Sequence, residues 1–268
     1  MKSICLFVQL VIQVRLGLRL LIESEFESSW ENDEVIVNVP FSVAGIGTTI
    51  LITSKFTGKL MLLDVGDGAL RDCIVTTQNS NFVNEIDMIA ITHGHFDHVG
   101  GLHSLLGFMR MLNRTLALSI LIPKNCQEAI GIIKGFREYY RDTLPFEIWY
   151  HELSDQSEFD TDFFKIEAIE VEHFGLESTP DAETLMPSLG YRVRVGETVI
   201  AYTGDTRPCK GAESVVRNAD LAIIEATRKE APSGPRVHLT INEAQSLAKL
   251  AKDHLLIHRL SQLPKPSG

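Results

Sequence analysis

The stretch Thr92-His93-Gly94-His95-Phe96-Asp97-His98-Val99-Gly100-Gly101 decides the fold. It places three histidines and one aspartate within six consecutive positions. The apolar run Ile86-Asp87-Met88-Ile89-Ala90-Ile91 comes directly before it and is typical of a buried strand. Imidazole nitrogens and carboxylate oxygens are the ligands that zinc prefers in catalytic sites, and a rigid strand end can aim such side chains. The stretch therefore predicts a metal site. The alternative is a surface loop that happens to be rich in histidine.

The spacing of these side chains predicts ligands for two ions. His93 and His95 lie two positions apart, so in an extended segment both point the same way and can bind one ion. Asp97 and His98 follow at the turn into a helix that we expect to begin near Gly100. They are displaced far enough along the chain to reach a second ion.

The pattern H-x-H-x-D-H after a hydrophobic strand resembles the signature of the metallo-β-lactamase superfamily. This resemblance implies an α/β fold, the four-layer αββα metallo-β-lactamase sandwich, and a hydrolase. His173 matches the third metal motif of the superfamily, Asp205 the fourth and His258 the fifth. Asp64 matches the aspartate that lies behind the metal loop and holds it by hydrogen bonds.

Length and composition fit one large domain. The chain has 268 residues, of which 44% are hydrophobic, and no linker or repeat divides it. It carries 35 acidic against 25 basic residues, a net charge of -10, which argues against a general nucleic-acid coat protein. The cysteines have no C-x-x-C spacing and predict reduced thiols in a cytoplasmic protein. They are Cys5, Cys73, Cys126 and Cys209.

The order of apolar and turn residues predicts the elements of the fold. Residues 35–39, 48–53 and 59–63 should form an antiparallel meander, followed by a helix at 69–77. A hairpin is expected about Gly196. The remaining expected helices are 102–112, 127–140 and 242–252, the last with Thr240 and Glu243 as a capping box, and the remaining expected strands are 116–122, 146–151, 163–172, 221–224 and 255–257.

The structure of the N-terminal part of the chain is harder to predict from its sequence. Residues 4–22 are apolar enough to suggest a signal peptide or membrane anchor, but Gln9, Gln13, Arg15 and Arg19 interrupt the apolar run. A central arginine costs about 2.5 to 3.5 kcal/mol on insertion into a membrane. We expect no membrane segment; an ordered strand, an amphipathic segment or a misassigned start codon are the alternatives. The acidic region 23–34 predicts a loop. We therefore expect an N-terminal extension at 1–34 and a hydrolase domain at 35–268.

Four further pieces of sequence indicate a branch of the superfamily. They are Asp205-Thr-Arg-Pro-Cys209, Ile223-Ile-Glu-Ala-Thr227, His238-Leu-Thr240 and Leu256-Ile-His258. In this order they resemble ribonuclease Z, the endonuclease that trims the 3′ end of precursor tRNA, over about residues 35 to 260. In that family a glutamate and a histidine at matching positions form an acid/base pair beside the metal ions. The resemblance assigns those roles here to Glu225 and His238.

The resemblance also implies metal-assisted phosphodiester hydrolysis by two divalent ions. Zinc is preferred on ligand grounds, and His/Asp sets also accept manganese or iron. Asp97 is expected to orient the nucleophile as well as bind metal, and Asp205 to bridge the ions. One ion would take His93, His95, His173 and Asp205, and the other Asp97, His98, Asp205 and His258.

The substrate stays open at this stage. Ribonuclease Z proteins of the common type carry a long arm between the third and fourth motifs, and the segment from His173 to Asp205 has room only for a loop and a hairpin. Precursor tRNA is the first candidate substrate, and the family implies a homodimer. An armless hydrolase of a cyclic phosphodiester, lactone or thioester, or a metal-bound module without catalysis, are the alternatives. Five basic residues near the motifs predict either a local positive field or solvated surface: Arg207, Lys210, Arg228, Lys229 and Arg236.

Overall fold

The computed structural model describes residues 28–174, 185–231 and 236–259. The apolar segment 4–22, for which we weighed a signal or anchor, lies outside these residues. Within the described ranges no helix is both long and apolar enough to cross a membrane.

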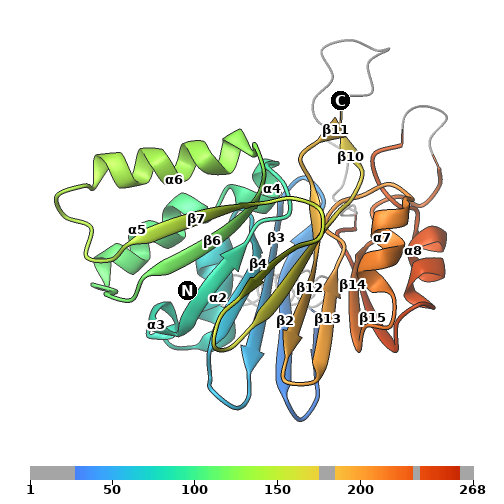
Figure 1. Cartoon of the computed structure of the whole chain (residues 1–268), viewed down its shortest axis with the longest axis horizontal. Coiled ribbons are helices and arrows are strands. Elements are labelled where there is room, and N and C mark those ends of the chain that lie inside the picture. The colour runs from blue at the N-terminus through green and yellow to red at the C-terminus, as the bar shows by residue number, and fades with distance from the viewer. Residues whose placement is uncertain (1–27, 175–184, 232–235, 260–268) are drawn as a thin grey trace, which may run out of the picture.

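One of the two large sheets is built from the first half of the chain (Figure 1). Its first four strands pair antiparallel, which confirms the predicted meander, and its last four run parallel. In spatial order the strands are β1 (Ser28–Glu31), β2 (Val35–Val43), β3 (Gly47–Ser54), β4 (Leu60–Val65), β5 (Ile86–Ala90), β6 (Leu118–Pro123) and β7 (Ile148–Leu153).

The other large sheet comes from the second half of the chain. In spatial order its strands are β15 (Asp253–Ile257), β14 (Leu221–Glu225), β13 (Thr198–Tyr202), β12 (Leu189–Val195), β9 (Lys165–Glu170) and β8 (Ser157–Asp160). The turn between β12 and β13 contains Gly196 at φ +60°, which confirms the predicted hairpin. A small separate ribbon pairs β10 (His173–Phe174) with β11 (Leu185–Met186).

Helices cover the outer face of each sheet, and three apolar layers separate the four layers of secondary structure. The first apolar layer lies between the first sheet and α2, α3, α5 and α6, the second between the two sheets, and the third between the second sheet and α7 and α8. This is the predicted αββα sandwich (Figure 1). The helices are α2 (Ala69–Thr77), α3 (Phe82–Glu85), α4 (Phe96–Val99), α5 (Leu102–Met111), α6 (Gln127–Tyr139), α7 (Lys210–Val216) and α8 (Ile241–Ala248).

The prediction of a loop at residues 23–34 is wrong for residues 28–31. Residues 28–31 form β1, which pairs with β2 at the edge of the first sheet. Trp30 packs against the core between the sheets, and its Nε1 donates a hydrogen bond to Asp253. The Glu34 carboxylate accepts hydrogen bonds from the backbone of Glu197 and Thr198 in the other sheet. Contacts this distant in sequence override the local acidic composition, and the boundary at residue 34 remains a prediction.

Candidate metal centre

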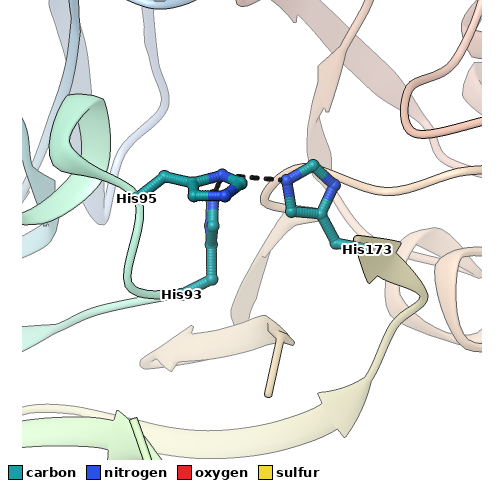
Figure 2. Close-up of side chains that lie close together, drawn as sticks. All are labelled: His93, His95 and His173. Carbon is teal, nitrogen blue, oxygen red and sulfur yellow. Dashed lines mark hydrogen bonds between the residues drawn. The ribbon is translucent and has the colours of Figure 1, made fainter. Parts of the chain in front are cut away.

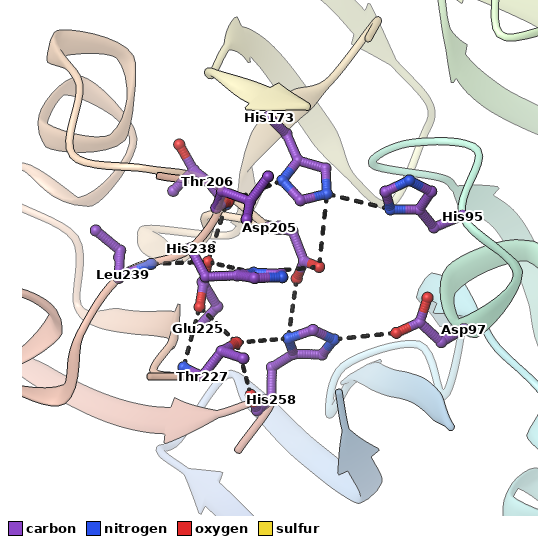
Figure 3. A network of polar contacts seen from close by, with 12 residues as sticks. His95, Asp97, His173, Asp205, Thr206, Glu225, Thr227, His238, Leu239 and His258 are labelled. Atoms are coloured by element: carbon purple, nitrogen blue, oxygen red, sulfur yellow. Dashed lines mark hydrogen bonds and ion pairs between the residues drawn. The ribbon is translucent and has the colours of Figure 1, made fainter. Parts of the chain in front are cut away.

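All nine residues predicted for the site converge at one edge of the sandwich, where strands of both sheets end (Figure 3). The carboxyl ends of neighbouring parallel strands meet at the same edge of a sheet, so side chains that follow them become neighbours. His93 follows β5, Asp205 follows β13, Glu225 ends β14 and His258 follows β15. Residues scattered over more than 160 positions of sequence therefore form one cluster. Its members are His93, His95, Asp97, His98, His173, Asp205, Glu225, His238 and His258.

Three histidines form the first half of the cluster (Figure 2). His95 Nδ1 lies 3.1 Å from His93 Nε2 and 3.1 Å from His173 Nε2. Asp205 Oδ2 lies 3.9 Å from the same nitrogen of His93 and of His173. The four side chains predicted to bind the first ion thus lie close together.

The second half uses two further histidines and Asp97. His258 Nε2 lies 3.3 Å from His98 Nε2 and 3.3 Å from Asp97 Oδ2. Asp205 Oδ2 is 3.4 Å from His98 Nε2, so this carboxylate contacts both halves. Asp205 is therefore the residue that would contact both ions if two were bound.

The donor atoms fit divalent metal. Two nitrogens bound at about 2.0 to 2.1 Å to a tetrahedral zinc lie about 3.3 Å apart, close to the separations between these rings. Asp205 Oδ1 supports the same conclusion. It is buried and has no hydrogen-bond partner in the described part of the chain, although His258 Nδ1 lies 3.2 Å away. A buried carboxylate oxygen left without a partner costs free energy that a metal ion removes.

Asp64 holds the metal loop from behind, as predicted. Its carboxylate accepts hydrogen bonds from Thr92 N at 2.7 Å, Thr92 Oγ1 at 2.8 Å and His98 Nδ1 at 2.7 Å. The Tyr202 hydroxyl donates a fourth at 2.8 Å. A proton on His98 Nδ1 leaves Nε2 as the nitrogen that faces the metal position. The sequence did not predict this role of Tyr202, because the residue looks like an ordinary core residue of a strand.

Glycines let the metal loop pack directly on the turn after β4. A Cβ atom at Gly66 would lie 2.1 Å from the carbonyl oxygen of Asp97. A Cβ atom at Gly101 would lie 2.2 Å from the carbonyl oxygen of Gly66, and both distances are too short for any side chain. Nearby, the Gly45 N–H donates a hydrogen bond of 2.7 Å to Asp97 Oδ2. Backbone contact on this scale fixes where α4 begins, and with it the direction of Asp97 and His98.

Glu225 and His238 lie beside Asp205 and face each other. Glu225 Oε1 is 3.0 Å from His238 Nδ1 and accepts hydrogen bonds from the backbone N–H groups of Thr206 and Leu239, each at 3.1 Å. His238 Nδ1 is 3.8 Å from Asp205 Oδ2. The side chain of His238 remains 17% exposed, whereas Glu225 is fully buried. The histidine is thus the member of the pair that a substrate can reach.

Burial and neighbouring charges shift the pKa values of the cluster in different directions. Burial holds the pKa of His93 well below its usual value and lowers the pKa of His173 to about 4, so both rings are neutral and able to bind metal. Burial also opposes the charged form of His98, but the carboxylates of Asp205 and Asp64 outweigh it and raise its pKa. Burial opposes the charged form of Asp97, but the hydrogen bond with His258 and the charges of His98 and His258 together outweigh it and lower its pKa to about 2.

The predicted positive field near the motifs receives little support. Arg207 Nε lies 2.6 Å from Glu172 Oε2, and its guanidinium lies over the ring of Phe174. Arg236 forms an ion pair with Glu243. Acidic partners therefore neutralise two of the five basic residues.

This fold and this cluster define a metal-dependent hydrolase. The family model described as "Beta-lactamase superfamily domain" matches residues 69–258, so the chain belongs to that superfamily. Among curated proteins it is 28% identical to ribonuclease Z of Pyrococcus abyssi, over 78% of this chain and 79% of that protein. It is also 28% identical to ribonuclease Z of Archaeoglobus fulgidus, over 81% and 86% of the two chains. These matches confirm the resemblance to ribonuclease Z.

Solved structures agree on the fold. The short form of human tRNase Z superposes with a TM-score of 0.64 at 22% identity, over 82% of this chain and 91% of that chain. The metallo-β-lactamase fold protein YhfI from Bacillus subtilis gives a TM-score of 0.66 at 19% identity, over 85% and 87%. The fold itself implies divalent metal binding, for which the His/Asp groups provide ligands.

Proposed function

We propose that the protein is a binuclear, zinc-dependent phosphodiesterase that cuts RNA near its 3′ end, as ribonuclease Z does. The observation that carries this proposal is the Glu225–His238 pair beside Asp205. Phosphodiester cleavage needs a proton for the leaving oxygen, and a histidine held by a carboxylate can supply it. Hydrolysis of a lactone or thioester would give this pair no clear task.

The assigned roles follow from the contacts of each group. His93, His95, His173 and Asp205 would hold one ion, and Asp97, His98, Asp205 and His258 the other. Such ions supply positive charge that activates water and neutralises phosphate oxygens. Asp97, with Oδ2 held by Gly45 N and His258, is placed to orient the attacking water.

His238 acts as the proton donor in this proposal. Burial disfavours its charged form, but the hydrogen bond with Glu225 and the charge of Asp205 outweigh burial and raise its pKa. Because Nδ1 is held by Glu225, Nε2 is the nitrogen that faces the leaving oxygen. Proton donation of this kind contributes about 10²- to 10⁴-fold to a rate.

The names of the relatives support RNA as the substrate, and precursor tRNA is our first choice. We further propose a cytoplasmic homodimer, the expectation drawn from the family.

One observation favours a second candidate, a hydrolase of small phosphodiesters. Only ten residues, 175–184, connect β10 to β11, and the rest of the segment up to Asp205 is accounted for by β11, β12 and β13. This leaves no room for a long arm that would grip tRNA. A diphosphatase from the PhnP family of known structure also shares the fold, with a TM-score of 0.58 at 21% identity.

The test compares two substrates with the zinc-loaded protein: a 3′-extended precursor tRNA and an aryl phosphodiester. Glu225→Gln and His238→Asn remove the proposed acid/base pair, and His254→Asn is the matched control because His254 is exposed. We expect cleavage of the tRNA at its 3′ boundary, lost by at least 100-fold in both site variants and unchanged in the control. Cleavage of the aryl ester alone would establish the second candidate. A protein that binds two zinc ions and cleaves neither would be a metal-bound module without this catalysis.

A further inference from the structure

Thr227 is a small hydroxyl residue that joins the acid/base pair to the second group of metal ligands. It lies two positions after Glu225, in the loop after β14, and is buried. Its Oγ1 is 2.7 Å from Glu225 Oε2, 2.9 Å from His258 Nδ1 and 2.9 Å from the carbonyl oxygen of His258. Figure 3 shows this hydroxyl between the two side chains. The loop conformation is further fixed because the Thr227 N–H donates to Glu225 Oε2 at 3.1 Å.

The geometry of His258 assigns the protons in this contact. Its Nε2 faces Asp97 and His98, so Nε2 must carry a lone pair to bind metal and the ring proton must lie on Nδ1. The Nδ1–H then donates to Thr227 Oγ1. The hydroxyl proton of Thr227 is free to donate in turn, and the Glu225 carboxylate is its strongest acceptor because it is charged and nearest.

Asp205 is the alternative acceptor for the Nδ1 proton of His258. Its Oδ1 lies 3.2 Å from His258 Nδ1, yet these two atoms do not form a hydrogen bond, and Oδ1 remains without a partner. The Thr227 hydroxyl, at 2.9 Å, receives the proton instead. Thr227, rather than Asp205, therefore fixes the ring of His258.

The backbone of His258 lies close to the same hydroxyl in an unusual conformation. His258 adopts φ +56°, a left-handed conformation that is unfavourable for a residue with a Cβ and is kept only where the surroundings hold it. Its N–H donates to the Ser42 hydroxyl at 3.1 Å, and its carbonyl oxygen contacts Thr227 Oγ1. The Ser42 hydroxyl thus holds the N–H side of this residue, and Thr227 lies against its carbonyl side.

We propose that Thr227 is a positioning residue that sets the tautomer of His258 and thereby the affinity of the second metal position. The inference rests on the two-metal site of the proposed function. Loss of a hydrogen-bond partner of a metal-binding histidine typically weakens metal affinity about 10- to 100-fold. Only the second ion should be affected, because His258 does not belong to the first group of ligands.

The first experiment measures zinc binding by competition with a chromophoric chelator. The parent protein is compared with Thr227→Val, which keeps the shape but removes the hydroxyl, and Thr227→Ser, which keeps the hydroxyl. We expect two binding events in the parent and in the serine variant. In the valine variant the first event should be unchanged and the second about 10- to 100-fold weaker. Equal binding by all three proteins, or a serine variant as weak as the valine variant, would overturn the inference and leave the proposed function intact.

The second measurement does not depend on how the variants fold. Long-range ¹H–¹⁵N correlation spectra of the zinc-loaded parent protein report which ring nitrogen of each histidine carries the proton. We expect His258 to carry it on Nδ1. A proton on Nε2 would overturn the inference even if zinc-dependent cleavage is intact. A parent that binds fewer than two zinc ions would overturn the two-metal proposal, and this inference with it.

Discussion

Replacement of Asp64 by asparagine tests how the metal loop is held. One carboxylate oxygen accepts from the Thr92 N–H, and the other accepts from Thr92 Oγ1, His98 Nδ1 and the Tyr202 hydroxyl. Asparagine has the same shape, but its nitrogen can only donate. Whichever way the amide turns, its NH₂ group faces at least one donor.

The magnitude follows from the less costly orientation. If the amide oxygen keeps the three side-chain donors, the NH₂ group faces the Thr92 N–H, and a buried backbone donor loses its partner at a cost of about 1 to 3 kcal/mol. The three remaining bonds lose their charged acceptor, which weakens each by about 0.5 to 1 kcal/mol. The expected loss in the free energy of unfolding of the metal-free protein is therefore about 2.5 to 6 kcal/mol. Zinc affinity should fall about 10- to 100-fold, because Thr92 and His98 belong to the metal loop.

Urea unfolding of the metal-free protein and chelator competition for zinc measure the two effects. Asp67→Asn is the matched control, since Asp67 lies three residues further on and is exposed. It should change neither quantity by more than about 0.5 kcal/mol. Zinc affinity of Asp64→Asn within twofold of the parent value would refute the reasoning, because the histidines would then keep their orientation without the carboxylate.

Three further predictions concern stability and thiol reactivity. The hydrogen bond from Thr198 lowers the pKa of Glu34 below its usual 4.5, so its stabilising contribution is complete above that pH and is lost as the pH falls below it. Acid unfolding of Glu34→Gln should therefore show a weaker pH dependence than that of the parent below about pH 5. Burial raises the pKa of Cys73 to about 12 and that of Cys126 to about 11, so neither thiol should react with a disulfide reagent at pH 8 until the protein unfolds. Thr240→Ala removes the capping box that opens α8 and should lower the free energy of unfolding by about 1 kcal/mol in urea titrations.

Each of these predictions has a clear contrary result. The same slope of stability against pH in the parent and in Glu34→Gln would mean that Thr198 does not stabilise the charged carboxylate. Rapid labelling of Cys73 in the native protein would mean that α2 opens readily. For α8, Thr240→Ser is the control, because serine caps about as well as threonine, and equal losses in both variants would reject the cap as the cause.

The sequence predicted the central elements of both sheets and most of the helices. Strands such as β4 and β14 are continuous apolar runs, and the capping box before α8 is a local signal. The sequence missed several short elements, among them β1, β8 and α7. The first two are edge strands with alternating half-buried and exposed residues, so they lack an apolar run. Helix α7 begins after Cys209, whose Sγ accepts a hydrogen bond from the Ala212 N–H, and a cysteine cap is a weak sequence signal.

The ligand positions could also be predicted, because each follows a recognisable strand. Apart from Asp64, their hydrogen-bond partners could not be predicted. Tyr202 reads as a core residue, and Thr227 reads as one more residue of a loop. What gives Thr227 its role is His258, 31 positions later, which lies beside it only because β14 and β15 pair in parallel with Glu225 opposite Ile257. A contact that depends on the register of two strands has no local signature.

The contacts of Glu225 also indicate which member of the proposed acid/base pair would donate a proton. A carboxylate offers about four lone-pair positions. Glu225 receives five contacts, from the backbone N–H groups of Thr206, Thr227 and Leu239, the Thr227 hydroxyl and His238 Nδ1. These contacts all come from donors, so they favour Glu225 as the acceptor that holds His238 in the proposed pair. In the proposed function the proton that moves would then belong to His238, whose ring is partly exposed.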